Sequence, residues 1–249
     1  MDSPMSELSL PEAVARMPYS KTDLARRAAV SRTTVLAVND DPSRARVDTL
    51  RELALALGYD LSIVLERASD PLAAAAARVM LGDLTLEGQK DGAELEAWID
   101  RLNRYSAGES ISIIPEAARL SSAQHRSGRH LLAGRVDADR LISAGRASEA
   151  RWVLSGSASL DALGAETGRT VVLWSEHANR VAELLADTHR RVRVVTAADL
   201  VVAPAHATVF EGSTTIEDVN LVSPIQGIID AFANGGVDRE IAESIVRSW

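Results

Sequence analysis

Residues 20–39 constrain the fold of this chain more than any other stretch, because they hold two helix starts separated by a very short turn. Ser20 and Ser31 each stand where a helix N-cap is expected. Apolar residues at helical spacing follow both caps. The pattern therefore predicts a tight helical hairpin, with one helix over residues 21–29 and a second over residues 32–39.

Two further helices are expected around this hairpin. The apolar spacing predicts them over residues 8–17 and 47–57, and Gly58 is a typical stop for the second. Residues 59–65 alternate in polarity and end in a β-branched run, which predicts a strand. We therefore expect an N-terminal domain over residues 1–67 that is all-α up to this closing strand.

The motif SKTDLARRAAVSRTTVLAVN and the following VDTLRELALALGYDLSIVL resemble the helix-turn-helix domain of the lambda-repressor-like (Xre) family of DNA-binding regulators. The resemblance covers residues 8–66. That family usually has glycine at the turn position that Ala29 occupies here. If the turn needs a positive φ, alanine is expected to cost about 1 kcal/mol, because its Cβ is crowded in that conformation.

The resemblance implies that residues 32–39 form a recognition helix in the DNA major groove. The residues it assigns to the DNA interface are Lys21, Ser31, Arg32, Thr33, Thr34, Ala37, Arg44 and Arg46. Arg32 would make a bidentate contact to guanine, worth roughly 1–3 kcal/mol of discrimination, and Thr33 and Ala37 would contact thymine methyl groups. Ser31 would cap the helix and Thr34 would lie beside the DNA backbone. Lys21, Arg44 and Arg46 would bind phosphates.

Charge is distributed unevenly along the chain. Residues 15–51 hold eight basic and four acidic side chains, a local net charge of +4 in a chain of net charge -8. A locally basic module is the electrostatic footprint of a DNA-binding domain, although a solvated helical face has the same composition. One short helix reads only a few base pairs, so we expect two copies, as a homodimer or side by side, on an inverted repeat.

The rest of the chain predicts a helical region and then a mixed domain. Helical patterns dominate residues 68–150, which we expect to form a helical linker region. Beyond them, strand patterns occur at 170–174, 192–196, 200–203 and 207–210, and helical patterns at 176–188, 224–234 and 237–249. The expected fold class is α+β: an all-α helix-turn-helix N-terminal domain followed by a mixed α/β C-terminal domain over residues 151–249.

RWVLSGSASLDALG, SPIQGIIDAFANGG and VDREIAESIV resemble parts of the C-terminal region of AbiEi-type antitoxins, which pair with a nucleotidyltransferase toxin in type IV toxin–antitoxin systems. The matching residues are Ser155, Gly156, Ala158, Leu163, Gly164, Pro224, Gln226, Asp230 and Gly236. The N-terminal module departs from that family, which typically has a winged helix there. Gln226 and Asp230 lie four residues apart on one helix face. They would either bond to neighbouring parts of the fold, which we favour, or contact a partner protein.

We find no pattern typical of an enzyme or a metal site. The chain has no cysteine, which excludes disulfides, thiolate metal sites and cysteine nucleophiles. Its five histidines form no HExxH pair, and no Walker A or GxGxxG motif occurs. No apolar run approaches 18 residues, so no transmembrane helix is expected. We therefore expect a cytoplasmic protein that is not an enzyme and that uses no cofactor or metal.

Three functions fit these patterns. The first is a DNA-binding transcriptional repressor that binds a double-stranded operator and acts as the autoregulatory antitoxin of a toxin–antitoxin-like operon. The second is a small-molecule-responsive transcriptional regulator without a toxin partner. The third is a protein-interaction module whose helical hairpin never meets DNA.

Overall fold

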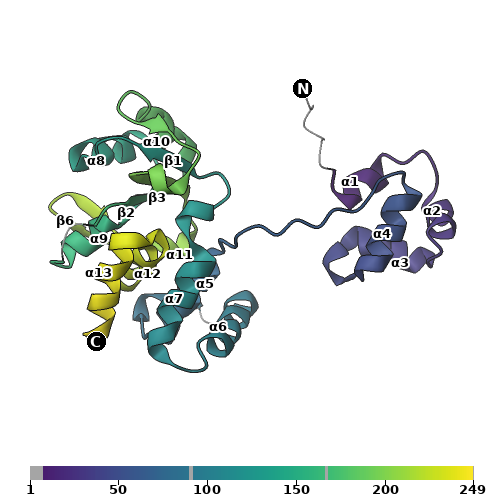
Figure 1. The fold of residues 1–249 in the computed structure, drawn as a ribbon, viewed down its shortest axis with the longest axis horizontal. Coiled ribbons are helices and arrows are strands. Elements are labelled where there is room, and N and C mark those ends of the chain that lie inside the picture. Colours follow the sequence, from purple (N-terminus) through teal and green to yellow (C-terminus); the bar gives the residue numbers. More distant parts are fainter. Residues whose placement is uncertain (1–7, 90–91, 166–167, 249) are drawn as a thin grey trace. The chain divides into compact units, whose positions relative to one another are not determined.

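The computed structural model describes residues 8–89, 92–165 and 168–248. The chain divides into two compact units, Met1–Glu66 and Arg67–Trp249 (Figure 1). The first unit is helical, and the second combines helices with a seven-stranded sheet. This arrangement confirms the α+β class. None of the helices in the described ranges has both the length and the apolar character needed to cross a bilayer.

The N-terminal unit packs its helices around a small aliphatic core. Its elements are α1 (Leu10–Ala15), α2 (Lys21–Arg27), α3 (Arg32–Asp40), the 3-10 helix η1 (Pro42–Arg44) and α4 (Val47–Ala56). The buried core residues are Val14, Leu24, Ala25, Ala28, Val35, Val38 and Leu53. All four α-helices of the unit therefore contribute to this core, and the short 3-10 helix η1 contributes none of these residues. The Tyr19 hydroxyl donates to the Ala56 carbonyl at 2.5 Å and ties the loop before α2 to the end of α4.

The strand expected over residues 59–65 is absent from the structure, and that prediction is wrong. The segment is extended, but it forms no ladder with any described strand. A strand is stable only when its backbone pairs with another strand. Residues 8–66 of the N-terminal unit form no sheet that this segment could join, so alternation alone does not produce a strand.

The C-terminal unit begins with helices and then alternates helices and strands. Its helices are α5 (Pro71–Met80), η2 (Leu84–Gln89), α6 (Ala93–Tyr105), α7 (Ser110–Ser121), η3 (Ala123–His125), α8 (Ala138–Ala147), α9 (Ser157–Ala162), α10 (Ala178–Leu184), η4 (Val195–Ala197), α11 (Ala207–Phe210), α12 (Pro224–Asn234) and α13 (Gly236–Arg247). Its strands are β1 (His130–Ala133), β2 (Trp152–Gly156), β3 (Val171–Ser175), β4 (Arg190–Arg191), β5 (Leu200–Pro204), β6 (Thr214–Ile216) and β7 (Val219–Leu221).

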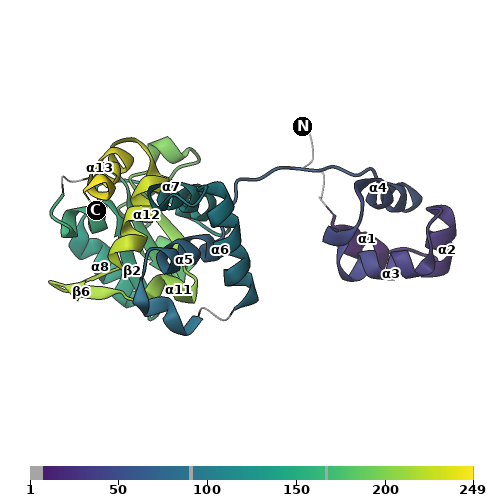
Figure 2. The ribbon, with the colours of Figure 1, turned by 90° about the horizontal axis from the view of Figure 1, so that it is seen from below.

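The sheet is mixed and is buried on both faces at its centre. Its strand order is β4-β1-β5-β3-β2-β7-β6, with β3/β5 and β2/β7 parallel and the other pairs antiparallel. Leu173 and Val202 belong to one face, which packs against residues of α8 and α10. Val172 and Val201 belong to the other face. The short hairpin β6–β7 forms one outer edge of the sheet (Figure 2).

A layer of helices completes this unit on the side of the sheet away from α8 and α10 (Figure 1). Residues of α5, α6, α7, α12 and α13 share one apolar cluster. The five alanines from Ala73 to Ala77 are all buried. Small side chains on every side of α5 let its neighbours approach closely.

The boundary expected at residue 150 differs from the structure. Residues 68–150 form no separate linker region: β1 pairs with β5 in the central sheet, and α5 and α7 share a core with α12. The helical patterns of this segment correctly predict helices. They do not show which later elements those helices pack against. Two strand predictions also fail. Residues 207–210 form the helix α11, and 192–196 contain no strand, since β4 ends at Arg191.

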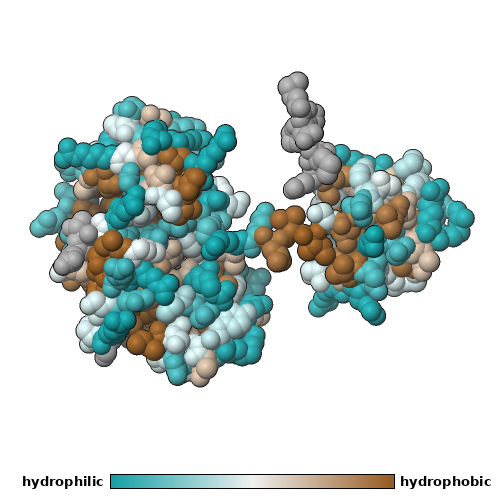
Figure 3. All heavy atoms as spheres, in the orientation of Figure 1, coloured by the Kyte–Doolittle hydropathy of each residue, from teal (hydrophilic) through white to brown (hydrophobic). Residues whose placement is uncertain are grey.

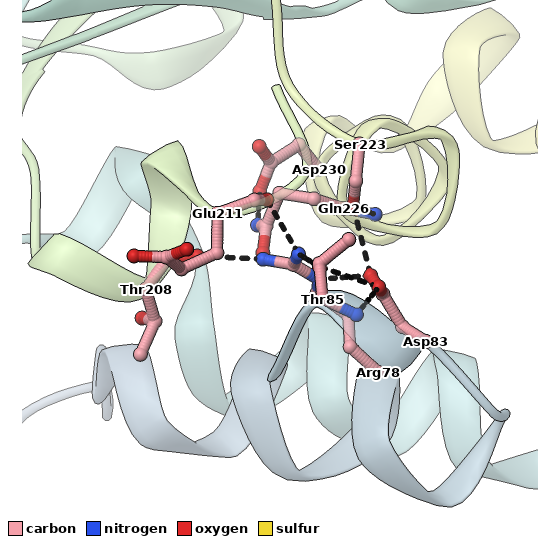
Figure 4. A network of polar contacts seen from close by, with 8 residues as sticks. All are labelled: Arg78, Asp83, Thr85, Thr208, Glu211, Ser223, Gln226 and Asp230. Carbon is pink, nitrogen blue, oxygen red and sulfur yellow. Dashed lines mark hydrogen bonds and ion pairs between the residues drawn. The ribbon is translucent and has the colours of Figure 1, made fainter. Parts of the chain in front are cut away.

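A buried arginine connects α5 to residues 208–211, some 130 positions later in the chain. The Arg78 side chain is fully buried and donates to the carbonyls of Thr208 and Glu211, each at 2.7 Å (Figure 4). Its Nε lies 2.8 Å from a carboxylate oxygen of Asp83, and its second Nη contacts the Thr85 hydroxyl at 3.2 Å. One guanidinium group therefore holds together α5, η2 and the backbone of α11.

Candidate nucleic-acid interface

The turn between α2 and α3 is built from backbone hydrogen bonds that require a left-handed residue. Ala29 has φ 53°. The Val30 N–H donates to the Ala25 carbonyl at 3.0 Å, and the Ala29 N–H donates to the Arg26 carbonyl at 3.4 Å. These two bonds are those of a Schellman motif, in which the residue after the helix cap is usually glycine. The positive φ at this turn confirms the geometry that makes alanine an unfavourable residue here.

We predict that Ala29→Gly stabilises the N-terminal unit by about 1 kcal/mol, because glycine removes the crowding of Cβ at positive φ. Ala37→Gly is the matched control, since Ala37 is also exposed but lies in right-handed helix. That variant is expected to lose about 1 kcal/mol. Hydrogen exchange of the α2 and α3 amides measures both changes, and a loss of protection in Ala29→Gly would contradict the prediction.

The N-terminal end of α3 is capped and open to solvent. The Ser31 hydroxyl accepts a hydrogen bond from the Thr34 N–H at 3.0 Å, as a cap should. Ser31, Arg32 and Thr33 are exposed. The Thr34 hydroxyl lies 2.8 Å from the Ser31 hydroxyl and is half-buried, so it supports the cap. One turn later Ala37 is exposed on the same helix.

Six of the eight residues expected at DNA line a single open groove of about 550 Å³ beside α3. They are Ser31, Thr33, Thr34, Ala37, Arg44 and Arg46. The other lining residues are Val38, Asp40, Asp41, Ala45 and Thr49. Lys21 and Arg32 lie outside the groove, at the first residues of α2 and α3. The structure thus brings together side chains from α3, from η1 and from the start of α4.

Two arginines of the groove are each paired with an aspartate. Arg44 lies 3.6 Å from Asp41, and Arg46 lies 3.6 Å from Asp48. The arginine side chains are 87% and 86% exposed, so these pairs contribute little and exchange readily for other anions. The pKa of Asp41 is lowered, mainly by the hydrogen bond from the Ser43 side chain.

Lys21 and Arg32 form no ion pair with any residue in the described ranges. Over the whole unit Met1–Glu66, ten acidic side chains outnumber eight basic ones. The positive charge is therefore confined to the hairpin and the segment after it. A polyanion would be attracted to this local surface only, not to the unit as a whole.

The sequence did not indicate every residue of the groove. Asp41 is one such residue: it lies in the groove beside Arg44 and fixes η1 by accepting a hydrogen bond from the Ser43 N–H at 3.1 Å. Thr49 lies on α4, and nothing in its sequence neighbourhood signals that it faces α3. Its place in the groove depends on the packing of α4 against the hairpin, which only the fold supplies.

Of the two roles expected for Gln226 and Asp230, the structure shows the favoured one, bonding within the fold, and the alternative of a partner-binding surface is wrong. Both are buried, and the Gln226 amide donates to the Asp230 carboxylate at 3.0 Å. The same carboxylate accepts from the Ser155 hydroxyl at 2.5 Å and from the Trp174 indole N–H at 2.8 Å. These contacts attach α12 to β2 and β3, so the two residues hold the C-terminal unit together.

Among the residues that the structure describes, no group of three or more histidines and carboxylates is arranged to hold a metal ion. Comparison of the chain with protein-family models, with curated proteins and with solved structures finds no match.

Proposed function

We propose that this chain is a sequence-specific DNA-binding transcriptional repressor of the cytoplasm, which reads an inverted repeat through α3. The observation that carries the proposal is the groove beside α3, where six residues expected at DNA come together next to an exposed, capped helix end. A helix end of this kind, flanked by exposed arginines, is the arrangement by which helix-turn-helix proteins enter the major groove.

The charges beside the groove suggest how the duplex is held. Arg32, which has no ion pair with a described residue, is the side chain we assign to a guanine edge. Arg44 and Arg46 would exchange their aspartates for phosphates, at small cost because both pairs are exposed. Phosphate contacts set the position of the protein on DNA, and base contacts supply the sequence preference.

For the C-terminal unit we propose an antitoxin role, in which the chain represses its own operon and counters a nucleotidyltransferase-type toxin. The support is the resemblance of residues 152–249 to AbiEi-type antitoxins. No catalytic role, cofactor or metal is proposed. A gene for such a toxin beside this one would support the antitoxin role.

The alternative is a regulator that responds to a small molecule. The observation in its favour is an open pocket of about 640 Å³ in the C-terminal unit, lined by Arg135, Asp137, Asp139, Arg140, Ser143 and Thr188. Its mixture of both charges suits a zwitterionic or polar ligand. A metabolic operon beside the gene, and DNA affinity that changes with an added metabolite, would favour this alternative.

We predict that Arg32→Ala and Arg46→Ala affect DNA binding in different ways. Arg32→Ala should reduce the preference for the operator over unrelated DNA by roughly 1–3 kcal/mol, because it removes a base contact. Arg46→Ala should weaken binding to all DNA and lower the slope of log affinity against log salt by about one unit, because it removes a phosphate contact. Titration of fluorescent duplexes at two salt concentrations measures both quantities.

Arg239→Ala is the matched control, because Arg239 is exposed and lies on α13 in the C-terminal unit. It should change neither the preference nor the slope. Equal loss of sequence preference in Arg32→Ala and Arg46→Ala would contradict the assignment of these two residues. Unchanged affinity in both variants would contradict the proposed interface.

A further inference from the structure

The segment that follows α4 exposes an unusual amount of apolar surface. Ile63, Val64 and Leu65 are 63%, 67% and 95% exposed. Hydrophobic atoms are visible along this extended segment in the space-filling view (Figure 3). Contiguous exposed apolar residues of this kind mark an interaction site more often than an ordinary surface.

The backbone of the same segment is also without partners. From residue 62 to residue 68, no backbone N–H or carbonyl bonds to any residue that the structure describes. The β-branched, alternating sequence is that of a strand, and the segment runs drawn out, without helix or turn (Figure 1). What the segment lacks is a second strand beside it.

We propose that residues 61–65 pair antiparallel with residues 61–65 of a second copy of this chain. An antiparallel pair of identical strands has two-fold symmetry, which is the symmetry of the commonest protein dimers. Each copy supplies the hydrogen-bonding partner that the other lacks. The pairing also covers part of the apolar surface of both copies.

Symmetry and charge select one register for this pair. A two-fold axis puts each residue and its copy on the same face of the ribbon, so one residue must lie opposite its own copy. A register centred on Ile63 puts Asp60 opposite Glu66 of the second copy, and facing like charges are unfavourable. A register centred on Val64 puts Ser62 opposite Glu66 instead. The charges therefore favour the register centred on Val64.

This register has two further favourable features. Leu61, Ile63 and Leu65 of both copies lie on one face of the ribbon and pack against one another. Arg67 lies diagonally across from Tyr59 of the second copy, within reach of a cation–π contact. Charge and apolar surface thus agree on the register centred on Val64 for a pair of identical copies.

Pairing through this segment would join two N-terminal units and so supply two recognition helices for one duplex. That consequence rests on the proposed function, whereas the pairing itself rests only on the segment. The solution mass without DNA tests the pairing alone. A monomer that still binds operator would overturn the pairing and leave the proposed function intact. A dimer that binds no DNA would support the pairing and overturn the proposed function.

The first experiment is sedimentation of the full chain at micromolar concentration. Wild type should sediment at twice the chain mass of 26.6 kDa, and Val64→Lys at the mass of one chain, because two lysines would face each other at the centre. Val194→Lys is the matched control, since Val194 is an exposed valine of the C-terminal unit, 60% exposed, and should stay dimeric. A wild-type monomer, or a dimer that Val64→Lys leaves intact, would overturn the proposal.

The second experiment uses the absence of cysteine from this chain. Residues that face each other in antiparallel strands have Cα atoms about 4.5–5.5 Å apart, within the range that a disulfide spans. Val64→Cys should therefore form a covalent dimer on mild oxidation, and Ser62→Cys and Val194→Cys should form far less of it. Equal cross-linking of all three variants would overturn the register and the pairing with it.

Discussion

Replacing Arg78 with methionine is expected to destabilise the C-terminal unit by about 3–5 kcal/mol, the cost typical of removing one partner from a buried ion pair. The Arg78 side chain is fully buried, and the Asp83 side chain is 8% exposed. Methionine fills a similar volume but donates no hydrogen bond. The Thr208 and Glu211 carbonyls would lose the donor that Arg78 now supplies to each of them.

The pKa of Asp83 shows how strongly the surrounding groups favour its charged form. Burial raises this pKa, but the hydrogen bonds from Thr85 and Arg78 and the charge of Arg78 together lower it by more than burial raises it. The net shift is therefore downward. Without the guanidinium group, the Asp83 carboxylate stays in a poorly solvated site with only neutral partners, which are the Thr85 N–H and the hydroxyls of Thr85 and Ser223. Most of the expected loss comes from this uncompensated charge.

Tryptophan fluorescence during denaturant unfolding measures this change in the C-terminal unit alone, because all four tryptophans lie after residue 66. Arg119→Met is the matched control. Arg119 pairs with Glu116 at 2.7 Å, but its side chain is 60% exposed, so the expected loss is less than about 1 kcal/mol. If Arg78→Met costs no more than this control, the guanidinium group does not hold the unit together as described.

The second large effect is a pH dependence that comes from Asp230. Burial raises the pKa of this carboxyl from 3.8 to about 6, although hydrogen bonds from Ser155, Trp174 and Gln226 and the charge of Arg126 act to lower it. The shift of about two units corresponds to about 3 kcal/mol. The folded protein therefore retains a proton on Asp230 over a range in which the unfolded chain has lost it.

The direction of the effect follows from this raised pKa. Where the folded state binds more protons than the unfolded state, the free energy of unfolding falls as pH rises. The contribution of Asp230 is fully present below about pH 4 and is lost as the pH rises through about 6. Asp230→Asn does not titrate, so its stability relative to wild type should rise by about 2 kcal/mol between pH 4 and pH 7, which is most of the full effect.

Unfolding curves of wild type and Asp230→Asn at several pH values measure this difference, and the other titrating groups cancel because both proteins share them. Asp161→Asn, at an exposed residue of α9, is the control for removing a carboxyl group that the fold does not bury. A difference for Asp230→Asn that stays constant from pH 4 to pH 7 would mean that the buried carboxyl keeps an ordinary pKa.

The helical hairpin could be predicted from sequence because its determinants are local. Ser20 and Ser31 cap helices within three residues of themselves, and the structure contains both caps. The apolar spacing of the hairpin marks the same residues that form its core, among them Leu24 and Val35. Ala29 could be flagged because it directly follows the first helix of the hairpin, at the turn position where the Xre family usually has glycine, and its φ is 53°.

The features that could not be predicted depend on distant partners. Residues 59–65 and 207–210 both have strand-like composition, yet one stays unpaired within the chain and the other becomes α11, because strand formation depends on an available edge. Arg78 looks like any helical arginine in the sequence, and its partners at Thr208 and Glu211 are some 130 residues away. The place of residues 68–150 in the C-terminal unit could not be predicted either, because β1, α5 and α7 pack against β5 and α12, which lie much later in the chain.

Footprinting of the full chain on the DNA upstream of its own gene tests the central claim most directly. We expect protection of two half-sites about one helical turn apart, related by an inverted repeat, with the guanine contacts of both lost together in Arg32→Ala. Uniform protection of the whole fragment that depends only on salt would contradict the claim that α3 reads a sequence. So would the absence of any protected site at protein concentrations high enough to saturate unrelated DNA.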